Sequence, residues 1–206
     1  MIATRAQEHI DQATSRAAAY TLFAHAFAYP DAERITALRE AANEVFEVGN
    51  SMALMRLAAI AREVRQENLE SVYVTLTTFS SSPDCPAFES AYFGNEPLRQ
   101  TQRMADIAGF YRAFGVDATA GGFRPDELPV ELEFMAFLCL KEAYAAEHLG
   151  APRTGQAKKA QRVFLEEHLG RFVGLPPGAL QVIGLEGQGS IRRGPVCQRQ
   201  TRIDAL

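Results

Sequence analysis

The sequence lacks any apolar run long enough to cross a membrane. No stretch of its 206 residues reaches the roughly 18 apolar residues of a spanning helix, and charge interrupts even the most apolar segments, as Arg56 does in SMALMRLAAI. The N-terminal segment carries Glu8 and Asp11 where a secretory signal would have its apolar core. We therefore expect a cytoplasmic protein without a signal peptide or a membrane span.

Cysteine is scarce, and basic residues are not in excess. Cys85, Cys139 and Cys197 lie far apart without a Cys-x-x-Cys pair, which fits a reducing compartment and no zinc framework. We expect these thiols to be buried or incidental. The formal net charge of -4 argues against general nucleic-acid binding, which requires a basic face.

Catalytic sequence motifs are also missing. The chain has no His-Glu-x-x-His motif, no P-loop and no glycine-rich dinucleotide fingerprint. No acidic residue stands three positions before any of the four histidines, which excludes the Glu-x-x-His pairs of di-iron bundles. The histidines are interpreted as surface or helix-end residues, although a triad assembled only in space stays open. We expect no cofactor, no metal site and no enzymatic activity.

The apolar spacing is helical nearly everywhere, and sustained strand-type alternation is absent. The pattern predicts an all-α fold, a single compact domain of roughly seven helices over residues 1–173. Its expected N-caps are Asp31, Ser51, Asn68 and Asp126. The segment VELEFMAFLCLKEAYAAEHLG is apolar nearly all round, which predicts a central, buried helix.

The C-terminal segment differs from the rest of the chain. Residues 174–206 are rich in Gly and Pro with weak periodicity, which predicts an irregular tail. The tail contains SIRRG, whose paired arginines could compete in cis for an acidic groove, although a basic or packed strap is the simpler interpretation.

Two loops stand out from the helices. PDCPAFESAYFG, residues 83–94, is apolar and stiffened by prolines, with one acid, Glu89. RPDELPVELEF, residues 124–134, crowds acids at a helix start, where capping and the helix dipole alone would favour them. Glu127 and Glu131 stand four residues apart, where like charges repel and a cationic partner would relieve the repulsion. Capping alone, and capping plus contact with a cationic peptide, both fit; we expect Glu127 and Glu131 to be partly exposed.

The ordered set of segments resembles the TorD/DmsD/NarJ family of redox-enzyme maturation chaperones. SVYVTLTTFSSSPDCPAFESAY is similar to the family signature of an aromatic, a Leu-Phe pair and a proline-rich loop ending in an aromatic-Glu-Ser element. YTLFAHAFAYP resembles its opening helix, MADIAGFYRAFGV the helix between the loops, and RPDELPVELEFM its hinge and following helix. The sequence departs from the pattern at Thr77, where the family has Phe, and at Glu127, where it has His.

The resemblance implies an all-helical chaperone without enzymatic activity. Such proteins bind the leader peptide, usually a twin-arginine one, of a molybdenum-containing oxidoreductase subunit of the dimethyl-sulfoxide-reductase type until its cofactor is inserted. The matching positions imply peptide contacts at Tyr73, Leu76, Phe88, Ser90, Tyr92 and Asp126. The need for rigid walls and for acids that accept a guanidinium adds Pro86, Glu89, Glu127 and Glu131.

The partners expected from this resemblance are the catalytic subunit of a molybdenum enzyme and its leader peptide. A monomer and a domain-swapped dimer are both compatible with it. Two rival interpretations stay open: a small-ligand-binding or enzymatic helical protein with Glu89 and Asp126 as acid and base, and a structural subunit of a redox complex.

Overall fold

The computed structural model describes residues 2–49, 51–77, 88–93, 96–118 and 122–170. Within these ranges the chain forms seven α-helices: α1 (Ile2–Phe27), α2 (Ala32–Val48), α3 (Met52–Glu63), α4 (Gln66–Thr77), α5 (Pro97–Ala113), α6 (Leu128–His148) and α7 (Ala151–Phe164). Two short turns complete them, the 3-10 helix η1 (Glu89–Phe93) and the π-helical turn η3 (Leu165–Leu169). The predicted all-α class is confirmed. The predicted tail, residues 174–206, lies outside the described residues.

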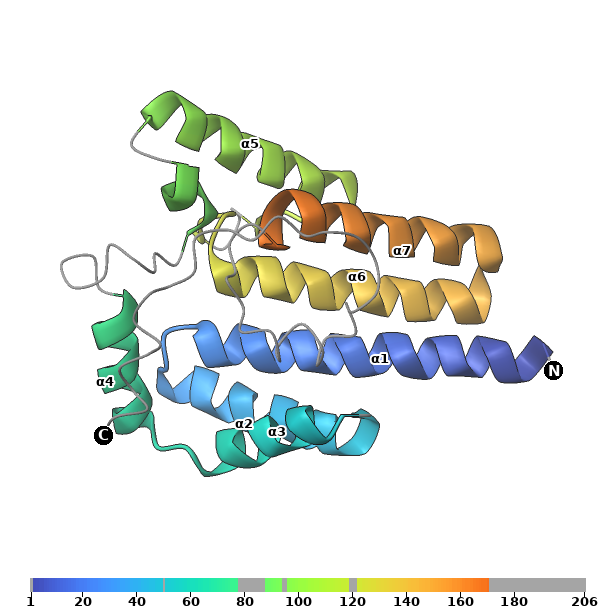
Figure 1. Ribbon diagram of the computed structural model, residues 1–206, viewed down its shortest axis with the longest axis horizontal. Coiled ribbons are helices and arrows are strands. Elements are labelled where there is room, and N and C mark those ends of the chain that lie inside the picture. Colours follow the sequence, from blue (N-terminus) through green and yellow to red (C-terminus); the bar gives the residue numbers. More distant parts are fainter. Residues whose placement is uncertain (1, 50, 78–87, 94–95, 119–121, 171–206) are drawn as a thin grey trace.

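The long helices lie side by side in a layered bundle. Figure 1 shows α1 between α6 on one side and α2 with α3 on the other, with α7 beyond α6; the closest packing is between α1 and α6. Small buried side chains on α1, among them Ala13, Ala17 and Ala24, let α6 approach closely. The prediction that VELEFMAFLCLKEAYAAEHLG, residues 130–150, forms a central, buried helix is confirmed, because α6 covers nearly this segment and many of its side chains are buried.

An aromatic cluster fills the core where α5, α6 and α7 meet. The ring centroids of Phe134 and Phe164 are 4.9 Å apart, and those of Tyr111 and Phe134 are 4.6 Å apart. Phe110 adds an edge contact to Phe134 at 5.9 Å. Such pairs stabilise beyond the area that they bury, by about 0.5–1.5 kcal/mol each. The cluster holds the first turns of α6 against the last turns of α5 and α7.

Two of the predicted helix caps are confirmed in position and two are wrong. Asp31 caps α2, and its carboxylate accepts the backbone N–H of Arg34 at 2.8 Å. Ser51 occupies the N-cap of α3 without a side-chain hydrogen bond. Asn68 is not a cap, because α4 already begins at Gln66. Asp126 is not a cap either; Glu127 holds the N-cap position of α6, and the Asp126 carboxylate binds another loop instead.

The reversal between α6 and α7 depends on a glycine. Gly150 has φ +80°, a left-handed conformation that side chains disfavour. Its N–H and that of Leu149 both donate to the carbonyl of Ala145, which closes the end of α6. Extended pairing is confined, within the described ranges, to an isolated antiparallel bridge between Phe88 and Glu127. No helix in those ranges is both long and apolar enough to cross a membrane.

A leucine pair on α6 tests the central position of this helix. Leu138 is 0% exposed and Leu140 is 53% exposed. Leu138→Ala should lower the free energy of unfolding by about 2–5 kcal/mol, because it removes buried methyl groups and leaves a cavity. Leu140→Ala, the matched control, should change it by about 0.5 kcal/mol or less. Urea denaturation measures both, and equal losses would contradict a buried α6.

Candidate functional site

A groove lies at the end of the bundle where the two unusual loops meet. It has a volume of about 760 Å³, in the range of ligand sites. Its walls come from the end of α1, the start of α2, the end of α4, the segment at Phe88, and the residues leading into α6. The lining residues with aromatic or charged side chains are His25, Tyr29, Asp31, Glu33, Arg34, Tyr73, Phe88, Phe123, Glu127 and Glu133.

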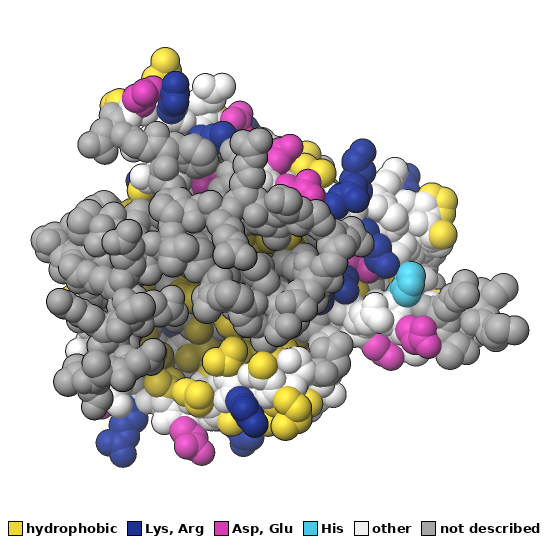
Figure 2. All heavy atoms as spheres, viewed as in Figure 1, with side chains coloured by type: hydrophobic (Ala, Val, Ile, Leu, Met, Phe, Trp, Pro, Cys, Tyr) yellow, Lys and Arg dark blue, Asp and Glu magenta, His cyan; other side chains and the backbone are white. Residues whose placement is uncertain are grey.

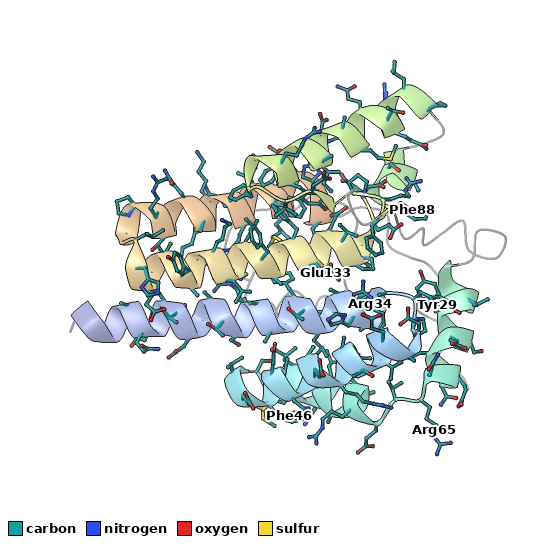
Figure 3. The ribbon with its side chains drawn as sticks, turned by 180° about the vertical axis from the view of Figure 1, so that it is seen from behind. Tyr29, Arg34, Phe46, Arg65, Phe88 and Glu133 are labelled. Atoms are coloured by element: carbon teal, nitrogen blue, oxygen red, sulfur yellow. The ribbon has the colours of Figure 1, made fainter. Side chains whose placement is uncertain are left out.

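Aromatic side chains give the groove its apolar walls. The rings of Tyr29 and Tyr73 meet edge to face at 5.4 Å, and Tyr29 remains 52% exposed. Phe88 lies under the guanidinium of Arg124, whose central carbon is 4.4 Å from the ring centroid. Figure 3 shows Tyr29, Arg34, Phe88 and Glu133 gathered towards one end of the molecule, with Arg65 lying apart.

Acidic side chains dominate the charge of the groove. Four carboxylates, those of Asp31, Glu33, Glu127 and Glu133, face one guanidinium, that of Arg34. Burial and the neighbouring Arg34 lower the pKa of His25, so this imidazole is neutral at pH 7. Burial raises the pKa of Glu127 from its ordinary value. The groove therefore favours a cationic ligand.

The two loops are joined by a buried carboxylate. Asp126, which is 0% exposed, accepts the backbone N–H of Ser90 at 3.2 Å and the Arg124 guanidinium at 3.1 Å. Its backbone carbonyl accepts the N–H of Glu89 at 2.9 Å. The hydroxyl of Tyr111 donates to the carbonyl of Pro125 at 2.7 Å and anchors the second loop to α5. These bonds place Phe88 and Glu127 next to each other on the groove wall.

Three further polar groups lie buried behind the groove. His168 Nδ1 is 3.1 Å from a carboxylate oxygen of Glu89, and their side chains are 4% and 0% exposed. Glu131 is also 0% exposed, and neither of its carboxyl oxygens has a hydrogen-bond partner among the described residues. Burial, with Glu89 and Asp126 close by, raises the pKa of Glu131 well above its usual range.

These positions correct two expectations from the sequence. Glu131 was expected to be partly exposed, but the first turn of α6 points it into the core, so it does not repel Glu127 across solvent. His168 was expected at the surface or at a helix end; it does lie in the last helical turn, η3, but its side chain is buried and points to Glu89. The expected burial of Cys139 is confirmed. Burial raises the pKa of this thiol to about 12, so it stays protonated.

The structure brings seven of the ten predicted peptide-contact residues together at one end, in two layers. Tyr73, Phe88 and Glu127 line the groove. Glu89, Ser90, Asp126 and Glu131 are buried and do not line it. The side chains of Leu76 and Tyr92, and the whole of Pro86, lie outside the described residues, as do Cys85 and Cys197. A direct contact between any of these residues and a peptide stays a prediction.

Sequence reasoning missed most of the opposite wall. The sequence pattern did not single out Tyr29, Arg34 or Glu133, because each looks like an ordinary residue of a helix or of a helix end. The segment YTLFAHAFAYP contains both His25 and Tyr29, and the end of its helix at Pro30 was the available signal. Phe123 precedes the second loop by a single residue. Only the arrangement of α1, α2 and α6 in space reveals that these residues face one groove.

Figure 2 shows a second apolar surface, at the lower edge of the view where α2 and α3 lie. Its exposed large side chains include Phe46, Met52, Leu57 and Ile60. The guanidinium of Arg62 covers the ring of Phe46 at 5.3 Å. This surface lacks the carboxylates of the groove. In the ranges that the structure describes, no group of three or more His, Cys, Asp or Glu residues could hold a metal ion.

Comparison with known proteins identifies the family. A family model described as the nitrate reductase delta subunit matches residues 43–175. The chain belongs to this family. It is 32% identical over 178 residues to a perchlorate reductase assembly chaperone protein of Dechloromonas aromatica (strain RCB), covering 79% of this chain and 76% of that protein.

The solved structures also include a similar helical protein. A crystal structure of a candidate redox enzyme maturation protein from Archaeoglobus fulgidus covers 71% of this chain and 92% of that chain, with a TM-score of 0.47 and 22% identity. The family assignment rests on the two sequence comparisons. It confirms the resemblance to the TorD/DmsD/NarJ group and the expected role as a system-specific assembly chaperone.

The buried Glu131 predicts an unusual dependence of stability on pH. Because its pKa is raised, the folded state holds this proton more tightly than the unfolded chain. Stability from this group is present at low pH and is lost as pH rises from the ordinary value of 4.5 towards the raised value. The free energy of unfolding of Glu131→Gln should therefore increase relative to that of the parent chain as pH rises.

Denaturant unfolding at about pH 5 and about pH 8 measures this change. Glu133→Gln, on the same helix and 46% exposed, is the matched control and should show little dependence on pH. A difference between Glu131→Gln and the parent chain that stays constant over this range would show that Glu131 is not held protonated by its burial.

Proposed function

We propose that this assembly chaperone binds the N-terminal leader peptide of a molybdenum-containing reductase catalytic subunit, in the cytoplasm and before cofactor insertion. The observation that carries the proposal is the acidic, aromatic groove, in which Phe88 and Glu127 of the two loops face residues of α1, α2 and α4. Its chemistry matches a peptide with a basic head and an apolar stretch. The proposal assigns the basic head to the carboxylates and the apolar stretch to the aromatic walls.

The charges of the groove suit arginine better than lysine. A guanidinium presents paired N–H donors that match a carboxylate edge to edge, whereas an ammonium acts as a point charge. Glu33 comes from α2, and Glu127 and Glu133 come from the N-cap and the second turn of α6, so neighbouring arginines of one peptide could find acceptors on both elements. This arrangement supports a twin-arginine leader as the ligand.

The groove is held open by bonds that do not involve a ligand. Asp126, Arg124 and Ser90 fix the two loops to each other, and Tyr111 fixes them to the bundle. A preformed wall lowers the entropic cost of binding. We therefore assign Ser90 and Asp126 a positioning role, and Glu89 the same role through His168 at the end of the helical domain.

The relatives narrow the class of client. The family model is described as the nitrate reductase delta subunit. The relative from Dechloromonas aromatica is described as a perchlorate reductase assembly chaperone protein. Nitrate and perchlorate reductases both reduce oxyanions. We propose a client of the same broad type, an oxyanion reductase of the dimethyl-sulfoxide-reductase superfamily.

The rival enzymatic interpretation assumed that Glu89 and Asp126 would act as acid and base. A histidine does stand beside Glu89, contrary to the sequence-based expectation, but Glu89, Asp126 and His168 are all buried away from the groove. A substrate in the groove would meet none of them directly. Fractionation tests the second rival interpretation, that the chain is a structural subunit of a redox complex. An assembly chaperone co-purifies with the apo catalytic subunit and is absent from the mature enzyme.

Binding can be measured without interference, because the chain has no tryptophan. A synthetic peptide with two adjacent arginines, an apolar run and a single tryptophan would report its own burial through fluorescence. We expect saturable binding that weakens when glutamines replace both arginines. Equal binding of the two peptides, or no binding of the first, would contradict the proposed function.

The aromatic wall is tested by two tyrosines of similar exposure. Tyr29, in the groove, is 52% exposed, and Tyr144, on the outer part of α6, is 58% exposed. Tyr29→Ala should weaken peptide binding by about 2 kcal/mol, roughly thirtyfold, because aromatic anchors dominate such interfaces. Tyr144→Ala should leave the affinity unchanged. Equal effects of the two changes would place the peptide elsewhere.

The acidic wall is tested by two glutamates. Glu127→Gln removes a carboxylate from the groove, and Glu63→Gln removes one from the exposed surface of α3. The first change should weaken binding of the arginine peptide roughly tenfold, the value of about one charge-assisted hydrogen bond. The second should have little effect at moderate salt, because exposed charges beyond the Debye length are screened. Fluorescence titration measures the affinity of both variants for the arginine peptide. An unchanged affinity in Glu127→Gln would show that this residue is not part of the binding site.

A further inference from the structure

One guanidinium already lies inside the acidic groove. Arg34 belongs to the first turn of α2, and it is the single Arg or Lys among the described lining residues. Its Nη1 donates to a carboxylate oxygen of Glu133 at 2.8 Å. The same Nη1 lies 3.1 Å from Nδ1 of His25. Figure 3 shows Arg34 beside Tyr29, at the end of the bundle that also holds Phe88 and Glu133.

The neighbours of Arg34 form a complete acceptor site for a guanidinium. His25 is neutral, because burial and Arg34 itself lower its pKa, so Nδ1 can accept an N–H with the ring proton on Nε2. Glu133 supplies a carboxylate from α6, across the groove. The aromatic wall of Tyr29 stands next to them. An arginine of a bound peptide would need the same set of partners.

The contact between Arg34 and Glu133 contributes little to the fold. The two side chains are 27% and 46% exposed, and ion pairs of this kind stabilise by about 0–1 kcal/mol. The cap of α2 does not depend on the Arg34 side chain, because Asp31 binds the backbone N–H of Arg34. A competing guanidinium could therefore displace Arg34 from Glu133 without opening the bundle.

We propose that Arg34 is an internal stand-in for the arginine of the client peptide. In the free chaperone it occupies Glu133 and His25, and a bound peptide displaces it and takes over both acceptors. The inference rests on the proposed function and deepens it, because it names the acceptors of one client arginine. It also predicts selectivity for peptides that contain arginine, because only a ligand with a guanidinium can replace Arg34 as the partner of Glu133.

The test compares Arg34→Gln with Arg65→Gln. Both changes remove one positive charge, but Arg65 is exposed outside the groove lining. The probe is the synthetic peptide with paired arginines and a single tryptophan, with its glutamine counterpart as the control. Arg34→Gln should tighten binding of the arginine peptide by up to about fivefold, the equivalent of breaking one partly exposed ion pair. It should leave binding of the glutamine peptide nearly unchanged, and Arg65→Gln should alter neither.

A second measurement follows Arg34 itself. The Nε–H signal of Arg34 in a nitrogen-15 spectrum, assigned by its absence in Arg34→Gln, should shift when the arginine peptide is added. It should move less with the glutamine peptide. The free energy of unfolding should stay within about 1 kcal/mol of the parent value in Arg34→Gln, so that a change in affinity is not a folding defect.

Each outcome separates the stand-in from the proposed function. Tighter binding of the arginine peptide in Arg34→Gln alone supports the stand-in. Weaker or unchanged binding, or an equal gain in Arg65→Gln, overturns it while leaving peptide binding by the parent chain in place. If neither the parent chain nor Arg34→Gln binds the arginine peptide, the proposed function fails and the stand-in fails with it.

Discussion

The buried carboxylate of Asp126 is the interaction on which the groove depends. It accepts an N–H from one loop and a guanidinium from the other, at 0% exposure, where such bonds are strong and costly to leave unmade. The first loop contributes only the short 3-10 turn η1 to the described residues, and the second leads into the start of α6. The bridge between Phe88 and Glu127 is the consequence, and it sets an aromatic ring and an acid side by side on one wall.

The same region carries polar groups that a purely structural core would avoid. Glu131 is buried without a partner among the described residues, and the buried carboxylate of Glu89 pairs with His168. Local rules of protein structure are broken most often at functional sites, where the surrounding fold compensates. Here the compensation comes from the aromatic cluster around Phe134 and Phe164, against which the ring of His168 also packs, 5.2 Å from that of Phe164.

The groove combines rigid walls with charges that are easily exchanged. Its loops are fixed by buried bonds, whereas the ion pair between Arg34 and Glu133 is partly exposed and weak. An assembly chaperone must release its client, so tight, fully desolvated ion pairs would be unsuitable. In the proposed function, aromatic contact area supplies affinity, while the partly exposed carboxylates favour arginine and still permit exchange.

The sequence by itself determined the helical class, the central place of α6 and the two loops that form the site, because helical periodicity and proline positions are local properties. The ordered motifs also sufficed to indicate the family. Only the tertiary structure decided which acids face the groove. Asp126 and Glu127 are adjacent in sequence, yet one is buried and the other lines the groove, because Ser90, 36 residues away from Asp126, donates to the first. Arg34 and Glu133 were likewise unpredictable, since 99 residues separate them and only the packing of α2 near α6 brings them together.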